Sequence, residues 1–68
     1  MHKFFITFKF MSEFRNCFRV VSATSHKEAV EFAKLTYPSD YSMVYSEAQW
    51  VNYEGKTQAV RFNLKEIK

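Results

Sequence analysis

The sequence predicts a small α+β domain with the element order ββαββ: a four-stranded antiparallel sheet, in the strand order 2-1-3-4, with one helix packed on one face. Three observations predict it. Residues 3–11 alternate with the period of two that is typical of a half-buried strand. Ser25 and Glu28 have the spacing of a helix capping box. The single Pro and the single Gly, Pro38 and Gly55, punctuate the second half of the chain.

The first two strands are predicted to form a hairpin. One side of residues 3–11 carries Phe4, Ile6, Phe8 and Phe10, and the other carries Lys3, Phe5, Thr7 and Lys9. Residues 11–15 turn the chain, and residues 17–23 form the second strand. The inner side of that strand is either Phe18 with Val20, or Cys17 with Val21 and Ala23. We favour the second alternative because Ala23 lies where a helix must pack closely.

The predicted helix begins after Ser25, whose hydroxyl caps the first turn. Its apolar residues share one arc of the helix surface, namely Ala29, Val30, Phe32, Ala33, Thr36 and Tyr37. The helix is expected to end near Thr36 or Tyr37, because the residue before Pro38 is biased away from helical backbone angles.

The second half of the chain predicts another hairpin. Residues 41–53 are rich in Tyr, Val and Trp and are expected to form a long third strand, with a bulge near residues 46–48 where the alternation slips. Residues 54–55 form a tight turn, and residues 57–67 form the fourth strand. The helix then covers one face of the sheet, and no residue remains to cover the other.

Composition limits the function. Residues 1–68 form a single domain, and aromatic residues make up 19% of it, more than one short helix can cover. The net charge of +3 suits an acidic protein surface or a nucleic acid. The longest apolar run, residues 4–8, is too short to span a bilayer, so no membrane partner is expected. One cysteine allows no internal disulfide, which favours a cytoplasmic protein.

The residues needed for catalysis or metal binding are too few. One Cys and two His, Cys17, His2 and His26, do not make a metal site, and the carboxylates are spread along the chain. A single glycine cannot build a phosphate-binding loop. We therefore expect a binding protein with no cofactor, no metal and no enzymatic activity.

The uncovered sheet face is the predicted binding surface. Its partner-binding residues, with their flanks, are Lys3, Phe5, Lys9, Arg15, Arg19, Trp50, Tyr53, Arg61 and Lys65. Interleaved basic and aromatic side chains on a sheet bind single-stranded nucleic acid in several modules, and exposed aromatic residues anchor protein partners. Two alternatives stay open. The face could simply be solvated, and Trp50 could belong to the core.

The Phe-rich strand, the residues Val21, Ala23, Ser25, Glu28 and Ala29 at the start of the helix, and the closing hairpin resemble the ββαββ members of the phage-encoded anti-CRISPR inhibitors. This resemblance implies a protein that binds a bacterial CRISPR effector complex in the host cytoplasm and blocks target DNA recognition or cleavage. The basic net charge argues against mimicry of DNA and favours steric blocking. A small nucleic-acid-binding protein and a self-associating homodimer are the alternative hypotheses.

Overall fold

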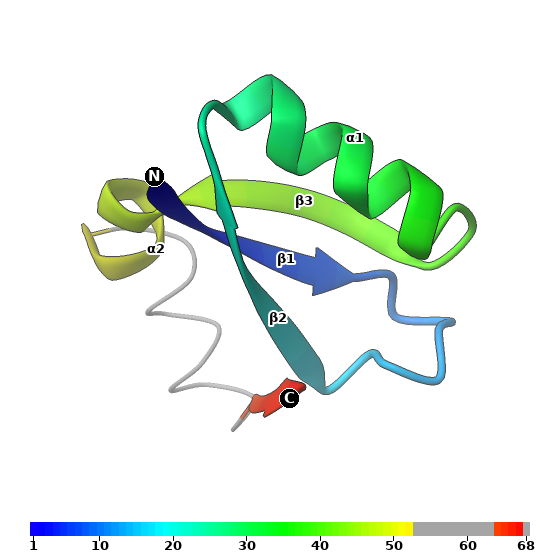
Figure 1. Ribbon diagram of the computed structural model, residues 1–68. Coiled ribbons are helices and arrows are strands. Elements are labelled where there is room, and N and C mark those ends of the chain that lie inside the picture. Colours follow the sequence, from blue (N-terminus) through cyan, green and yellow to red (C-terminus); the bar gives the residue numbers. More distant parts are fainter. Residues whose placement is uncertain (53–63, 68) are drawn as a thin grey trace.

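The computed structural model describes residues 1–52 and 64–67, which form a four-stranded sheet with two helices (Figure 1). The elements, in chain order, are β1 His2–Phe8, β2 Cys17–Ala23, α1 His26–Thr36, β3 Tyr41–Ser46, α2 Glu47–Asn52 and β4 Lys65–Ile67. The α+β class is therefore confirmed, as is the order of the first four elements. The second helix was not predicted.

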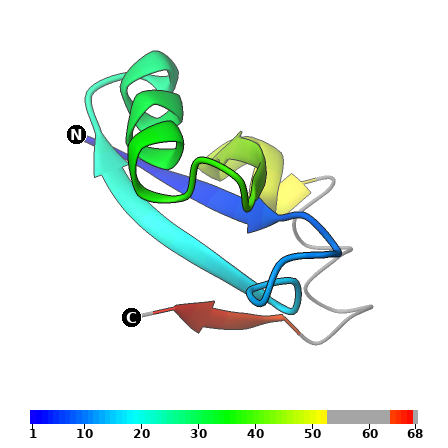
Figure 2. The same ribbon diagram turned by 90° about the vertical axis from the view of Figure 1, so that its right-hand side faces the viewer.

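The strand order is β3-β1-β2-β4. β1 lies between β2 and β3 and pairs with both in the antiparallel direction, which confirms the predicted neighbours of the first strand. The predicted order 2-1-3-4 is wrong in its last position, because β4 joins the outer edge of β2 (Figure 2). That pairing is parallel, with Cys17 opposite Lys65 and Arg19 opposite Ile67, so the sheet is mixed rather than antiparallel.

The long third strand is also wrong, since β3 ends at Ser46 and α2 follows at once. The reason is a capping box. The backbone N–H of Gln49 donates to Ser46 Oγ at 3.2 Å, and the backbone N–H of Ser46 donates to Gln49 Oε1 at 2.9 Å. These two bonds start a helix where a bulge was expected. The predicted turn at residues 54–55 and residues 57–63 of the predicted fourth strand lie outside the described residues.

The first helix begins as predicted. Ser25 is its N-cap, and the Glu28 backbone N–H donates to Ser25 Oγ at 3.2 Å. The Glu28 carboxylate accepts from the backbone N–H and the hydroxyl of Thr24, at 3.1 and 2.8 Å. The bond to Ser25 satisfies a backbone N–H that a helix start leaves without a partner, and the two bonds from Thr24 tie the preceding residue to the first turn.

The core lies between α1 and the sheet. Ile6, Ala29 and Ala33 are completely buried, and the two alanines let the helix approach the strands closely. Val21 and Ala23 of β2 face this core, which confirms these two residues of the favoured inner side, Cys17, Val21 and Ala23. Phe10 does not reach it, contrary to expectation, because β1 ends at Phe8 and the chain turns.

Candidate functional site

Trp50 of α2 covers part of the sheet face opposite α1. Its ring stacks on Phe5 with centroids 4.9 Å apart and planes 1° from parallel. It also contacts Phe18, at 4.9 Å, and Tyr45, at 6.0 Å. These three sheet residues share one face because Phe5 is the cross-strand partner of Tyr45, and Phe18 is the partner of Thr7, two residues along β1.

The expectation that this face has no cover is therefore wrong where Trp50 lies. The Trp50 side chain is only 8% exposed, so it belongs to the packing, which is the alternative that the sequence left open. The physical reason is α2: by ending β3 at Ser46, the second capping box turns the following residues back onto the sheet.

The structure spreads the other predicted binding residues over several surfaces. Lys3 is exposed on the Trp50 face, at the end of the sheet where β1 begins. Lys9 and Arg15 are exposed in the connection between β1 and β2. Lys65 is exposed on β4, and its backbone N–H donates to the Asn16 carbonyl at 2.9 Å, which brings it next to Arg15 in the fold. Tyr53 and Arg61 lie outside the described residues.

Arg19 lies on the other face of the sheet, under α1. Its Nη1 donates to the Tyr37 hydroxyl at 3.0 Å, and its guanidinium carbon lies 5.5 Å from the centre of the Phe32 ring. The side chain is half-buried and forms no ion pair with a carboxylate among residues 1–52 and 64–67. Arg19 therefore does not belong to one surface with Lys3 and Phe5.

The connection between β1 and β2 presents two large apolar side chains to solvent. Phe10 is 82% exposed and Met11 is 83% exposed. The backbone around them is fixed by Ser12, which is buried: its hydroxyl accepts from the Phe14 N–H at 3.0 Å, and its own N–H donates to the Lys9 carbonyl at 2.9 Å. Phe14 packs against Phe8, with ring centroids 5.2 Å apart. Phe10 and Met11 are thus exposed to solvent on a turn whose backbone is held by hydrogen bonds.

A groove of about 360 Å³ borders this turn, and we call it the loop-end groove. Its lining residues are Thr7, Phe8, Phe10, Arg15, Asn16, Cys17 and Leu64. Arg15 supplies a positive charge at its rim, and its guanidinium donates to the Ser12 carbonyl at 3.4 Å. Apolar and aromatic walls with one cationic side chain suit a partner that brings an apolar group and a carboxylate.

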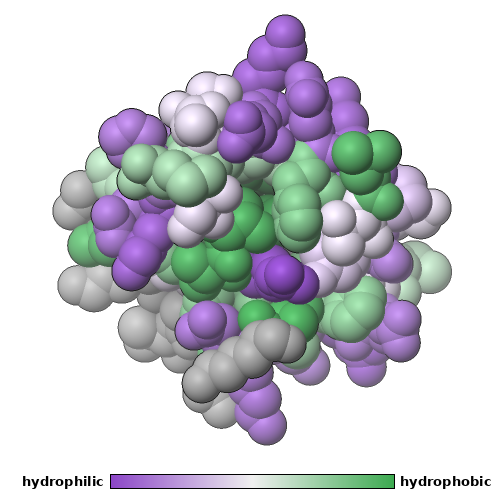
Figure 3. All heavy atoms as spheres, viewed as in Figure 1, coloured by the Kyte–Doolittle hydropathy of each residue, from purple (hydrophilic) through white to green (hydrophobic). Residues whose placement is uncertain are grey.

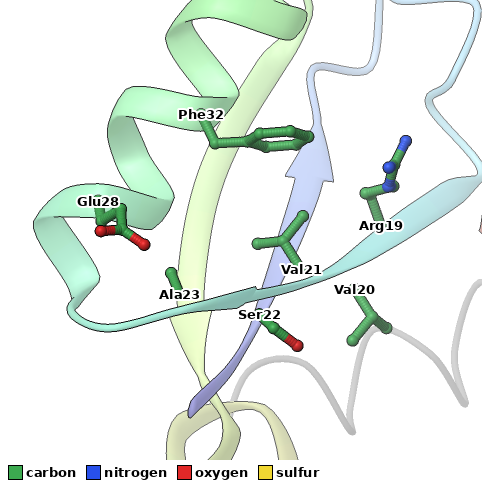
Figure 4. A pocket seen from close by; sticks show the side chains of 7 residues that line it. All are labelled: Arg19, Val20, Val21, Ser22, Ala23, Glu28 and Phe32. Carbon is green, nitrogen blue, oxygen red and sulfur yellow. The ribbon is translucent and has the colours of Figure 1, made fainter. Parts of the chain in front are cut away.

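A second groove, of about 350 Å³, lies between β2 and α1 (Figure 4), and we call it the β2-edge groove. Its lining residues are Arg19, Val20, Val21, Ser22, Ala23, Glu28 and Phe32. Side chains of a strand alternate between its two faces, so five consecutive lining residues mean that the strand's edge itself borders the groove. On the face of the molecule that is turned to the viewer in Figure 1, apolar side chains gather near the middle, with hydrophilic ones among them (Figure 3).

The titratable groups described make contacts within the fold. In the described part of the chain, no three His, Cys, Asp or Glu residues come together as a metal site would require. His26 Nε2 lies 2.8 Å from the Val44 carbonyl, which is a structural contact between α1 and β3. Hydrogen bonds from Thr24 lower the pKa of Glu28.

None of the helices described is both long and apolar enough to cross a membrane.

Comparison with known proteins adds no relative: no family model, no curated protein and no solved structure matches this chain. The sequence prediction missed the exposure of Phe10 because it placed this residue on the apolar side of the first strand, which in fact ends at Phe8. One signal was present. The turn that follows this strand carries Phe10, Met11 and Phe14 within five positions, which is unusual for a solvated connection.

Proposed function

We propose that this chain is a non-catalytic binding protein that docks onto a protein partner through the loop-end groove and the two side chains beside it, Phe10 and Met11. The observation that carries the proposal is their exposure, 82% and 83%, on a turn whose backbone Ser12 fixes. Aromatic and Met side chains are enriched at protein interfaces, and a rigid turn loses little conformational entropy on binding. No cofactor is needed for this role.

Charge supports an acidic partner surface. Lys9, Arg15 and Lys65 are exposed around this end of the sheet, where the exposed acidic residues on the same segments are Glu13 and Glu66, and the whole chain has a net charge of +3. The resemblance to anti-CRISPR inhibitors, in the order of the first four elements, makes a bacterial CRISPR effector complex the partner that we propose. The chain would inhibit it by sterically blocking target DNA recognition or cleavage.

The burial of Trp50 argues against nucleic acid as the main partner. Nucleic-acid-binding sheets present flat aromatic rings on which bases stack. Here the ring of Phe5 is already stacked on Trp50, and Trp50 is 8% exposed. A protein partner that contacts Phe10 and Met11 does not require these rings.

Affinity capture from a bacterial lysate, with and without nuclease, tests the proposal. The tagged wild-type protein should retain a protein complex that survives nuclease, and a purified CRISPR effector complex should bind it and lose DNA cleavage. Phe10→Ser and Arg15→Gln should each weaken capture about tenfold or more, since they remove the apolar anchor and the rim charge. The matched control is Leu35→Ser, because Leu35 is equally exposed, at 85%, but lies on α1.

Three outcomes would contradict the proposal in different ways. Capture that disappears with nuclease would favour nucleic-acid binding. Equal loss in the Phe10 and Leu35 variants would show that exposed apolar side chains act without specificity. Effector complexes that cleave DNA normally in the presence of the protein would exclude the CRISPR partner while leaving the loop-end groove as a binding site for another protein.

A further inference from the structure

The outer edge of β2 is only half occupied. β4 pairs with Cys17, Phe18 and Arg19, and its last residue, Ile67, lies opposite Arg19. Beyond that point β2 continues through residues 20–23, and no strand in the described part of the chain pairs with this stretch on that side. An unpaired strand edge presents backbone N–H and C=O groups that a further strand can bond.

The hydrogen bonds that are present show which groups point outward. The Asn16 carbonyl accepts from the Lys65 N–H of β4. Backbone groups of alternate residues point to the same side of a strand. The carbonyl of Val20 and both the N–H and the carbonyl of Ser22 therefore point toward the open edge. No Lys or Pro interrupts residues 20–23, although natural sheets commonly use these residues to block such an edge.

The β2-edge groove extends beside this open edge. In Figure 4, Arg19 and Val21 rise from β2 on the side of Phe32, whereas Val20 and Ser22 point away. Every second side chain of an added strand would enter the groove and contact Val21 and Phe32. An apolar side chain in the middle of the added strand fits these walls.

Opposite charges mark the two ends of the groove. Arg19 lies at one end, where Tyr37 and Phe32 fix its guanidinium and no carboxylate among the described residues pairs with it. Glu28 lies at the other end, next to Thr24. Arginine has five N–H donors in a planar fork that matches a carboxylate, and one donates to Tyr37. A peptide with an acidic side chain at the Arg19 end would therefore be complementary to the charges of the groove.

We propose that residues 20–23 of β2 bind an extended peptide segment of a partner protein as an added strand, with an acidic side chain of the peptide paired with Arg19, an apolar one against Phe32 and a basic one near Glu28. This site uses none of the residues that line the loop-end groove, nor Met11 beside it. It is therefore independent of the function proposed above, and either can fail alone.

The probe is the peptide acetyl-Thr-Glu-Thr-Val-Thr-Lys-Thr-amide together with the same sequence in reverse order, since one suits a parallel and the other an antiparallel added strand. Each is titrated into the ¹⁵N-labelled full chain. The better peptide should shift the amide signals of residues 20–23 and Phe32 and slow the exchange of the Ser22 N–H with solvent. Failure of both peptides to shift these signals at millimolar concentration would overturn the proposal.

Charge and backbone are then tested separately. Replacing the peptide's Glu with Gln should weaken binding about five- to tenfold, and Arg19→Gln should abolish that difference. Lys34→Gln, at an exposed position of α1 outside both grooves, is the matched control and should leave the difference unchanged. Equal affinity of the Glu and Gln peptides for the wild-type protein would overturn the role of Arg19, whether or not the Arg19 variant folds.

Two N-methylated peptides, methylated on alternate residues, test strand pairing. Only one set of peptide N–H groups faces β2, so one methylated peptide should lose binding at least tenfold and the other should bind within about twofold of the parent. Equal behaviour of the two would overturn strand addition. Protection of the Ser22 N–H that rises with protein concentration alone would also overturn the proposal, since a second copy would then occupy the edge.

Discussion

The two faces of the sheet are closed by different means. On one face, the eleven-residue helix α1 packs along the sheet, and many buried side chains share the contact: small or aliphatic ones such as Ile6 and Ala29, and aromatic ones such as Phe8. On the other, the six-residue helix α2 contributes one large ring, Trp50, which contacts three aromatic side chains. Among residues 1–52 and 64–67, the first closure is distributed over a whole helix, and the second is made by the Trp50 ring.

Because of this difference, substitutions under α1 should lower the stability of the whole domain, whereas substitutions at Trp50 should loosen only the structure around it. Loss of one contact under α1 affects the core that joins the central strands. It therefore lowers the free energy of unfolding of the whole domain. Loss of Trp50 affects a short helix that can detach while the sheet remains folded. We therefore expect cooperative unfolding of the α1 face and local opening at the Trp50 face.

The largest expected effect is Ile6→Ala. Ile6 is completely buried under α1, and removal of a buried Ile side chain typically costs about 3–4 kcal/mol of unfolding free energy. Urea unfolding followed by circular dichroism measures it. Leu35→Ala, at a position that is 85% exposed, should change the same quantity by less than about 0.5 kcal/mol. Similar losses in the two variants would mean that the α1 face is not the main core.

Trp50→Ala should lower the free energy of unfolding by less than Ile6→Ala does, and by less than the about 3–5 kcal/mol that is usual for a buried Trp→Ala change. The short helix can release its contacts without opening the α1 face. Native-state hydrogen exchange should show the α2 amides exchanging faster while the amides of β1 and β2 keep the protection set by global unfolding. Val51→Ala is the control, since Val51 is in the same helix and half exposed. Uniform loss of protection across the sheet would contradict the proposed difference between the faces.

Removal of the two helix caps compares the faces directly. Ser25→Ala should lower the free energy of unfolding by about 1 kcal/mol, because α1 loses a capping bond and the core depends on α1. Ser46→Ala should instead release α2, which would shift the emission of the single tryptophan to longer wavelength in the native protein. Ser39→Ala, at an exposed turn position, should do neither. If the emission of the tryptophan shifted in the Ser25 variant and not in the Ser46 variant, the Ser46 cap would not be what holds α2 on the sheet.

The smallest effect concerns pH. Hydrogen bonds from the hydroxyl and backbone N–H of Thr24 lower the pKa of Glu28 below its ordinary value of 4.5. A carboxyl with a lowered pKa in the folded state contributes its stabilisation above the unfolded pKa, and that stabilisation is lost as pH falls through the folded value. Glu28→Gln should therefore flatten the acid side of the stability curve slightly. Thr24→Ala, which removes the hydroxyl donor, should flatten the same part of the curve, and an unchanged curve in that variant would exclude the Thr24 hydroxyl as the cause.

The parts of the fold that depend on neighbouring residues were predictable. Ser25 and Glu28 fix the start of α1, and the alternation of residues 17–23 matches β2 over its full length. The partner of the last strand was not predictable, because local pattern says nothing about which free edge a strand joins. For residues 47–52 two local signals competed: Tyr, Val and Trp favour a strand, whereas Ser46 and Gln49 form a capping box, and the capping box decides the structure.

The candidate site was predictable in part. Lys9, Arg15 and Lys65 are exposed, but the exposure of Phe10 depends on the end of β1, which an alternating pattern locates poorly. Arg19 was predicted to flank the uncovered face, whereas its side chain lies under α1, and the sequence contained the correction. Arg19 has the same parity as Val21 and Ala23, so the alternation that places those two under α1 places Arg19 there as well.

The parallel pairing of β4 with β2 has a consequence for the kinetics of folding. The hairpin of β1 and β2 closes over a short turn, but β4 reaches β2 from the far end of the chain, and most of the sequence lies between the paired residues Cys17 and Lys65. Closing so long a loop costs more entropy than closing the hairpin, and a three-residue strand returns little for it. β4 should therefore dock after the rate-limiting step, so that substitutions at Ile67 accelerate unfolding and leave the folding rate nearly unchanged.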